Sequence, residues 1–144
     1  MTRALYKALQ ASGMHLQNYG TVFATIADKD KEEALPLIRR FYQLGFNIEA
    51  TAGTAQFLKA HGIRTHVLKK ISEGSEEIPN ALRQGHIAYV INTKDPGGST
   101  QVDGAQIRQI ATEYNVTMFT ALDTVRVLLD VLEETTLTIS TIDA

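Results

Sequence analysis

The sequence predicts an α/β protein with a doubly wound, five-stranded parallel sheet and helices on both faces. Short apolar stretches alternate with longer stretches whose apolar residues recur every three or four positions. The predicted strands are rich in Val, Ile and Phe without strict polar alternation, as expected for strands buried on both faces. Each strand is followed by a helix, and this order predicts right-handed crossovers between parallel strands.

The first strand is predicted at residues 21–27 (TVFATIA), and the helix after it has an apolar face made of Ala34, Leu35, Ile38, Phe41 and Tyr42. Asp30 and Glu33 resemble a capping box, so this helix is expected to begin near Lys31. Pro36 predicts a kink or a delayed start, because proline lacks a backbone donor and clashes with the preceding turn. Gly45 is expected to end the helix.

Four further strand–helix units follow the same pattern. The other strands are predicted at residues 46–50, 64–68, 87–92 and 117–120. The helices between them are predicted at residues 54–61, 78–84 and 103–114. Gly62 and Gly85 are expected to end the first two of these helices. The last helix is recognised by an apolar face that contains Val125, Leu128, Leu129 and Leu132.

The two ends of the chain lie outside this pattern. Residues 1–13 have helical spacing, so residues 1–19 are expected to form a linker or tail helix of a preceding region. Residues 20–144 are then the domain itself. Its last ten residues (TTLTISTIDA) are rich in β-branched side chains and are therefore β-prone.

The composition excludes several classes of protein. A chain of 144 residues is long enough for one domain with a sizeable core. Its net charge of −2 argues against a nucleic-acid or polybasic membrane partner. It contains no cysteine, which excludes disulfides and thiolate metal sites and fits a cytoplasmic location. No apolar run approaches the ~20 residues of a bilayer-spanning helix.

Residues at the carboxyl ends of the predicted strands suit an anion. Open parallel sheets bind ligands beyond these ends. The candidate residues, including one at the start of the first helix, are Thr25, Lys31, Thr51, Gly53, Thr54, Lys70, Asn92, Thr93 and Lys94. Hydroxyls, an amide and lysines around helix N-termini present donors and positive potential, and this combination favours a phosphate group.

The stretch TAGT at residues 51–54 is the most specific part of this set. Gly53 allows a close backbone approach or a positive φ, Thr54 could cap the helix, and Thr51 offers a hydroxyl to a phosphate oxygen. Taken alone, the stretch favours a simple helix cap after a β-branched strand end. The agreement among several strand ends favours the anion site.

The sequence contains no motif that assigns a catalytic or metal-binding residue. The four histidines show no metal-ligand spacing, and surface or structural roles are favoured for them. Glu73, Glu76 and Glu77 crowd the start of a helix, where the helix dipole favours solvated carboxylates. Neither a P-loop, a G-x-S-x-G elbow nor a dinucleotide-binding glycine pattern is present.

From Gly20 to about Glu134 the chain resembles the methylglyoxal-synthase-like domain. Within that superfamily it is most similar to the C-terminal allosteric domain of the carbamoyl-phosphate synthase large subunit. The resemblance is carried by the order and spacing of DKDKEEAL, LGFNIEATAGTAQFLKAHGI, VLKKISEG, YVINT, DGAQIRQIATEYNV and TALDT. The segment ALYKALQASG is similar to the one that leads out of that family's second synthetase half.

The resemblance implies a regulatory domain that is not itself an enzyme. Its ligand would be an effector such as UMP, IMP or phosphoribosyl pyrophosphate, and it would regulate glutamine-dependent carbamoyl phosphate synthesis for arginine or pyrimidine synthesis. The phosphate contacts that it implies come from Thr25, Lys31, Thr51, Thr54 and Lys70. Asn92 and Thr93 would lie near the ribose and base. The implied partners are the rest of the large subunit and the glutaminase subunit, and ATP and Mg²⁺ would belong to that parent ligase.

Two positions depart from the family pattern. Lys94 stands where many relatives have a second threonine, and its charge either favours a more highly phosphorylated effector or points to solvent. Met118 stands near the place of a tyrosine that ornithine-responsive relatives have, which argues against an ornithine response.

The alternative function is that of methylglyoxal synthase, an enzyme that acts on dihydroxyacetone phosphate. It would use the same phosphate site and would also need a carboxylate to remove a carbon-bound proton. True synthases resemble GDQQ where this chain has GSEE at residues 74–77, so Ser75 takes the place of the catalytic aspartate. Glu76 is the carboxylate that could substitute for it, but the rest of the chain favours the regulatory relative.

Overall fold

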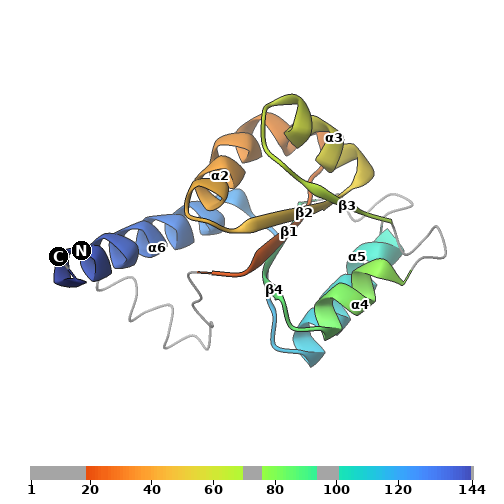
Figure 1. Ribbon diagram of the computed structural model, residues 1–144. Coiled ribbons are helices and arrows are strands. Elements are labelled where there is room, and N and C mark those ends of the chain that lie inside the picture. The colour runs from red at the N-terminus through yellow and green to blue at the C-terminus, as the bar shows by residue number, and fades with distance from the viewer. Residues whose placement is uncertain (1–18, 70–75, 94–100, 144) are drawn as a thin grey trace.

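The structure is a computed structural model, and it describes residues 19–69, 76–93 and 101–143. Its strands form one parallel sheet in the order β3-β2-β1-β4-β5 (Figure 1). The strands are β1 (Thr21–Thr25), β2 (Asn47–Thr51), β3 (His66–Leu68), β4 (Ile87–Asn92) and β5 (Thr117–Phe119). The helices are α2 (Lys31–Gln43), α3 (Ala52–Ala60), α4 (Glu77–Arg83), α5 (Gln101–Glu113) and α6 (Leu122–Asp143). The predicted fold class is confirmed.

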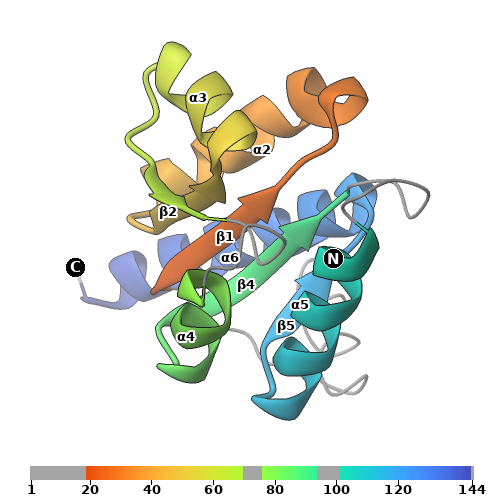
Figure 2. The ribbon, with the colours of Figure 1, turned by 90° about the vertical axis from the view of Figure 1, so that its right-hand side faces the viewer.

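The helices divide between the two faces because the chain reverses its direction across the sheet. It runs from β1 to β2 and β3, and then crosses back to β4 on the other side of β1. The direction of a right-handed crossover decides which face its helix covers. Helices α2 and α3 therefore cover one face and α4 and α5 the other, while α6 returns to the first. Figure 2 shows α4 and α5 in front of the strands and α6 behind them.

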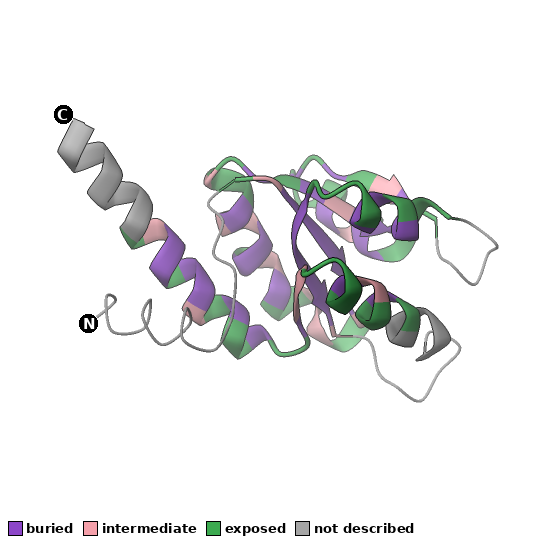
Figure 3. Cartoon of the chain, turned by 90° about the horizontal axis from the view of Figure 1, so that it is seen from below, coloured by how far each residue is buried: buried purple, intermediate pink, exposed green. Residues whose placement is uncertain are grey.

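Each face of the sheet has its own apolar core. The larger core joins α2, α3 and α6 to the sheet, and it contains the rings of Phe41 and Tyr89, whose centroids lie 6.0 Å apart. The smaller core joins α4 and α5 to the opposite face through Ile78, Leu82 and Ile107. Figure 3 shows buried strands between helices that are buried only on their inner sides. Burial on both faces explains the continuous apolar runs of the strands.

Helix α6 is held against α2 by ion pairs. The guanidinium of Arg40 donates to both carboxylate oxygens of Glu133, at 2.9 and 2.7 Å, and to Asp130 at 2.8 Å. The hydrogen bonds to Glu133 raise the pKa of Arg40 above its ordinary value.

In the described ranges, no helix combines the length and the apolarity that a bilayer crossing requires.

The expectations for the start of α2 were partly wrong. The helix begins at Lys31, as predicted, but Asp30 makes no side-chain cap hydrogen bond. A short 3₁₀ helix, η1 (Asp28–Asp30), precedes α2, so the backbone of Asp30 has φ −103° and ψ −6° in place of the extended conformation of a capping box. Pro36 does not delay the start, since it lies inside a continuous helix. The glycines predicted to end α2, α3 and α4 directly follow the last turns of these helices.

The β-prone interpretation of the last ten residues was also wrong, because α6 continues to Asp143. A helix that has already formed adds one hydrogen bond for each further residue, and the lower helix propensity of Thr and Ile costs well under 1 kcal/mol per residue. The tail helix expected at residues 1–13 lies outside the described residues.

Candidate functional site

The strand order reverses between β1 and β4, and this switch point is where open α/β sheets bind ligands. The last residue of β1, Thr25, is the register partner of Asn92, the last residue of β4. After Thr25 the chain leads to α2 on one face, and after Asn92 it leads toward α5 on the other. The two chain segments therefore diverge at this point.

Polar side chains are buried at the switch point, where an ordinary core would be apolar. The exposed fractions of Thr25, Thr51, Thr54 and Asn92 are 5%, 2%, 1% and 8%. We call these residues, together with the half-buried Thr93, the switch-point cluster. Burying a polar group is unfavourable unless it is hydrogen-bonded, so the partners of each hydroxyl decide what the cluster can do.

Two members of the cluster hold the loop that follows β1. The Thr54 hydroxyl accepts a hydrogen bond from the backbone N–H of Ile26 at 3.0 Å and lies 3.5 Å from the carbonyl oxygen of the same residue. The Thr93 hydroxyl accepts a hydrogen bond from the N–H of Ala27 at 3.0 Å. The loop is therefore fixed from α3 on one side and from the end of β4 on the other.

The other two threonines retain an unused donor. The hydroxyls of Thr51 and Thr25 lie 3.4 Å apart, and the hydrogen bond between them uses only one of their two hydrogens. Within the described part of the chain, the second hydrogen has no acceptor. A buried donor of this kind is free to bind an acceptor oxygen of a ligand.

The start of α3 differs from the prediction in two respects. The helix begins at Ala52, so Thr51 takes the N-cap position and Thr54 lies inside the helix and cannot cap it. Gly53 lies in the first turn and is not among the glycines with positive φ, so its role is not conformational. The Thr51 side chain makes no cap hydrogen bond, and in the described part of the chain no other side chain accepts one from the first N–H groups of α3.

Lys31 reaches from α2 to this first turn of α3. A Cβ atom added to Gly53 would lie 3.7 Å from the Lys31 ammonium, so the charged group packs close to the glycine. The Lys31 side chain is 17% exposed, and its ammonium forms an ion pair with the carboxylate of Asp28. A lysine and a helix N-terminus are thus adjacent, and both attract anions.

The structure brings seven of the nine predicted site residues to one end of the sheet: Thr25, Lys31, Thr51, Gly53, Thr54, Asn92 and Thr93. Lys70 and Lys94 lie outside the described residues. Among the residues that the structure describes, no three His, Asp or Glu side chains are placed to hold a metal ion.

A family model described as the MGS-like domain matches residues 33–120, which is more than half of the chain. The chain belongs to the MGS-like domain family. The match includes β2 to β5 and the cluster residues on them, whereas Thr25 and Lys31 precede it.

Solved structures resemble this MGS-like domain over most of its length. Methylglyoxal synthase from Elizabethkingia anophelis NUHP1 aligns with a TM-score of 0.64 and 18% identity, and the alignment covers 79% of each chain. The structure of ForH aligns with a TM-score of 0.56 and 16% identity over 80% of each chain. At these identities the similarity establishes a shared fold.

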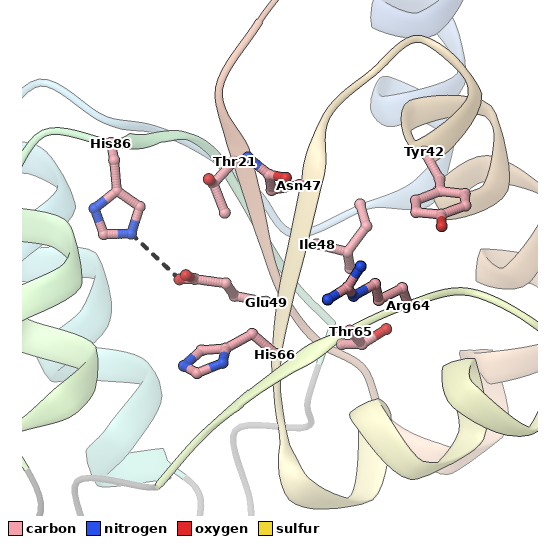
Figure 4. Close-up of a pocket in the computed structure, with 9 residues that line it drawn as sticks. All are labelled: Thr21, Tyr42, Asn47, Ile48, Glu49, Arg64, Thr65, His66 and His86. Atoms are coloured by element: carbon pink, nitrogen blue, oxygen red, sulfur yellow. Dashed lines mark hydrogen bonds and ion pairs between the residues drawn. The ribbon is translucent and has the colours of Figure 1, made fainter.

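The MGS-like domain also has a cavity at the amino ends of its strands that sequence analysis missed. It has a volume of about 560 Å³, and its walls include Thr21, Asn47, Glu49, His66 and His86 (Figure 4). The Glu49 carboxylate faces the His86 ring, with 3.4 Å between Oε1 and Nε2. The feature of the sequence that could have indicated this cavity is Glu49, a charged residue in the middle of the strand β2. This cavity lies at the end of the sheet opposite to the switch point.

Proposed function

We propose that this MGS-like domain binds a phosphate-containing effector of the UMP, IMP or phosphoribosyl pyrophosphate type at the switch point. One observation carries the proposal: buried threonines from β1 and β2, the uncapped start of α3 and the Lys31 ammonium meet at one place. Each of them donates hydrogen bonds or positive potential, which a phosphate group requires.

Some of these residues would contact the phosphate directly, and others would hold the loop beside it. The phosphate would accept hydrogen bonds from the first-turn N–H groups of α3 and from the free hydroxyl hydrogen of the Thr25–Thr51 pair, while Lys31 would balance its charge. Thr54 and Thr93 would act indirectly, by holding the loop between β1 and α2. Lys70 and Lys94 are proposed as additional cations of the same site.

The proposed role is regulation of glutamine-dependent carbamoyl phosphate synthesis by a larger parent chain. The motif resemblance to the allosteric domain of the carbamoyl-phosphate synthase large subunit supports it. An effector could change the activity of that parent only by the difference in its affinity for two arrangements of the whole protein, typically ~1–3 kcal/mol. The domain by itself would bind the effector without regulating anything.

Methylglyoxal synthase remains the alternative, because an enzyme of that name shares the fold. Such an enzyme needs a carboxylate base near the phosphate site. The Glu77 carboxylate accepts a hydrogen bond from the backbone N–H of Lys69 at 2.8 Å, which gives it a structural role at the start of α4. Glu76 is exposed at the start of α4, and Ser75 lies outside the described residues. The carboxylate of Glu76 is thus the candidate base for this alternative.

A melting-temperature screen tests the proposal. UMP, IMP and phosphoribosyl pyrophosphate would be added to the wild type, Lys31→Ala and Thr51→Val. A ligand present at ~100 times its dissociation constant adds ~2.7 kcal/mol to the stability of the folded state, so a true effector raises the melting temperature of the wild type. We expect the rise to be much smaller in both variants.

Two outcomes would contradict this proposal. Equal shifts in all three proteins would remove Lys31 and Thr51 from the site. Formation of methylglyoxal from dihydroxyacetone phosphate by the wild type, lost in Glu76→Gln, would favour the enzyme over the regulatory domain.

A further inference from the structure

We propose that Asp28 is the competing counter-ion of the switch-point site, so that its carboxylate weakens the binding of phosphate ligands. This inference rests on the proposed function and adds the residue that regulates the affinity of the site. It starts from the ion pair that the Asp28 carboxylate forms with the Lys31 ammonium.

The two partners of this ion pair differ in how firmly they are placed. The Lys31 side chain is 17% exposed and packs over the first turn of α3, where its ammonium approaches Gly53. The Asp28 side chain is 94% exposed and belongs to η1, the short 3₁₀ helix that precedes α2. The lysine is therefore positioned by the packing of α2 against α3, and the aspartate reaches it from the solvent side.

This difference indicates that Asp28 competes with a phosphate for the Lys31 ammonium and does not hold the ammonium in place. Exposed ion pairs contribute little to holding a side chain in place, because solvent screens them and the side chains must be ordered. Removing Asp28 would therefore leave the ammonium at the start of α3. The carboxylate nevertheless carries a full negative charge, and a phosphate that binds the same ammonium is brought close to it. Like charges at such a distance repel each other.

The proposal predicts which variant binds more tightly. Replacing Asp28 by asparagine removes the charge and nearly preserves the shape of the side chain. At low ionic strength we expect Asp28→Asn to bind inorganic phosphate about three- to tenfold more tightly, as expected for one repulsive charge in a partly hydrated site. The gain should be larger for pyrophosphate, which carries more negative charge. It should decrease at about 1 M salt, where the Debye length is about 3 Å.

The experiment is a calorimetric titration of the full chain with inorganic phosphate and with pyrophosphate. Asp130→Asn is the matched control, because Asp130 also forms an exposed pair with a cation of α2, Arg40, which lies in the last turn of that helix, at the opposite end from Lys31. This variant changes the net charge equally but removes a carboxylate of α6, and we expect its affinity to change less than twofold. The double variant Asp28→Asn, Lys31→Met tests the coupling: the gain from Asp28→Asn should be smaller in it than in the wild-type background, because no ammonium is left to compete for.

The outcomes separate this inference from the proposed function. If Lys31→Met weakens phosphate binding while Asp28→Asn leaves it unchanged or weakens it, Asp28 is not a competitor and the site itself stands. A gain of the same size without Lys31 would also overturn the competition for the ammonium. If neither probe binds the wild type or any variant, both the phosphate site and the role of Asp28 are wrong.

Discussion

The threonines of the switch-point cluster are alike in sequence and differ in their partners. The Thr54 hydroxyl bonds the backbone of Ile26, whereas the Thr51 hydroxyl bonds, among the described residues, only another hydroxyl. The positions of these residues could be predicted, because the carboxyl ends of parallel strands meet at one edge of a sheet. Their partners could not, because the backbone that Thr54 contacts is 28 residues away along the chain.

The hydrogen bond of Thr54 predicts a loss of stability on mutation. Thr54→Val keeps the shape of the side chain but leaves the buried N–H of Ile26 without an acceptor. We expect the free energy of unfolding to fall by about 1–3 kcal/mol, measured by urea denaturation. Thr112→Val, on the exposed side of α5, is the control and should change it by about 0.5 kcal/mol or less. A similar small change for Thr54→Val would show that its hydrogen bond is dispensable.

Lys31 and Gly53 show a second limit of prediction from sequence at the residue scale. Both were predicted as site residues, Lys31 from its place at a helix start and Gly53 from its backbone freedom. The structure gives the glycine a helical conformation and places the lysine ammonium beside it. The closeness of Gly53 to this ammonium is a tertiary property that no local pattern encodes.

At the scale of the elements, the strands were predicted well because each is a short apolar run between polar or glycine-containing turns. The predicted strand at residues 87–92 has the observed bounds of β4. Helix starts were less accurate, since α3 begins two residues before the predicted Thr54. The sequence there offers two threonines, and whether a strand ends at the first or the second depends on pairing with its neighbours. The last ten residues were interpreted as β-prone, but they form part of α6. The packed first half of this helix nucleates it, so that the helix can extend through residues of lower helix propensity.

Pro36 makes α2 less stable than it could be. It lies beyond the first turn of the helix, where it removes the hydrogen bond to the carbonyl of Glu32 and crowds that carbonyl. We expect Pro36→Ala to raise the free energy of unfolding by about 1–3 kcal/mol, less the entropy that proline removes from the unfolded chain. Urea denaturation measures the change.

The matched control for this variant is Pro79→Ala. Pro79 lies in the first turn of α4, where no hydrogen bond within the helix is lost, and it is buried. Its replacement should bring no gain and a small loss of packing. A destabilised Pro36→Ala protein would mean that Pro36 has a packing role that outweighs its effect on the helix.

At the scale of the whole molecule, the α/β class followed from alternation alone, but the strand order did not. Each crossover can place the next strand on either side of the previous one, and no local pattern marks the return from β3 to β4. That return creates the switch point, so the class of site could be predicted while its position between β1 and β4 could not. The cavity near Glu49 was missed for the same reason, since its walls come from several separate segments.

The two cores predict independent effects on stability. Ile38 belongs to the larger core and Ile78 to the smaller, and the sheet separates them. Ile38→Val and Ile78→Val should each lower the free energy of unfolding by about 0.5–1.5 kcal/mol, and the double variant should equal the sum within about 0.5 kcal/mol. Ile38→Val with Ile63→Val, both in the larger core, is the comparison in which coupling is allowed. Strong coupling between Ile38 and Ile78 would mean that the sheet transmits packing changes between its faces.

The central position of β1 also affects how the protein is made. Among the strands of this domain β1 is translated first, and every one of its residues is buried in the finished fold. One of its edges pairs with β2 soon afterwards, but the other waits for β4, which is translated only after α4. Until then the nascent polypeptide presents an apolar strand with an unpaired edge, a feature that promotes aggregation. The interval between translation of β2 and β4 is therefore the period in which chaperone protection matters most.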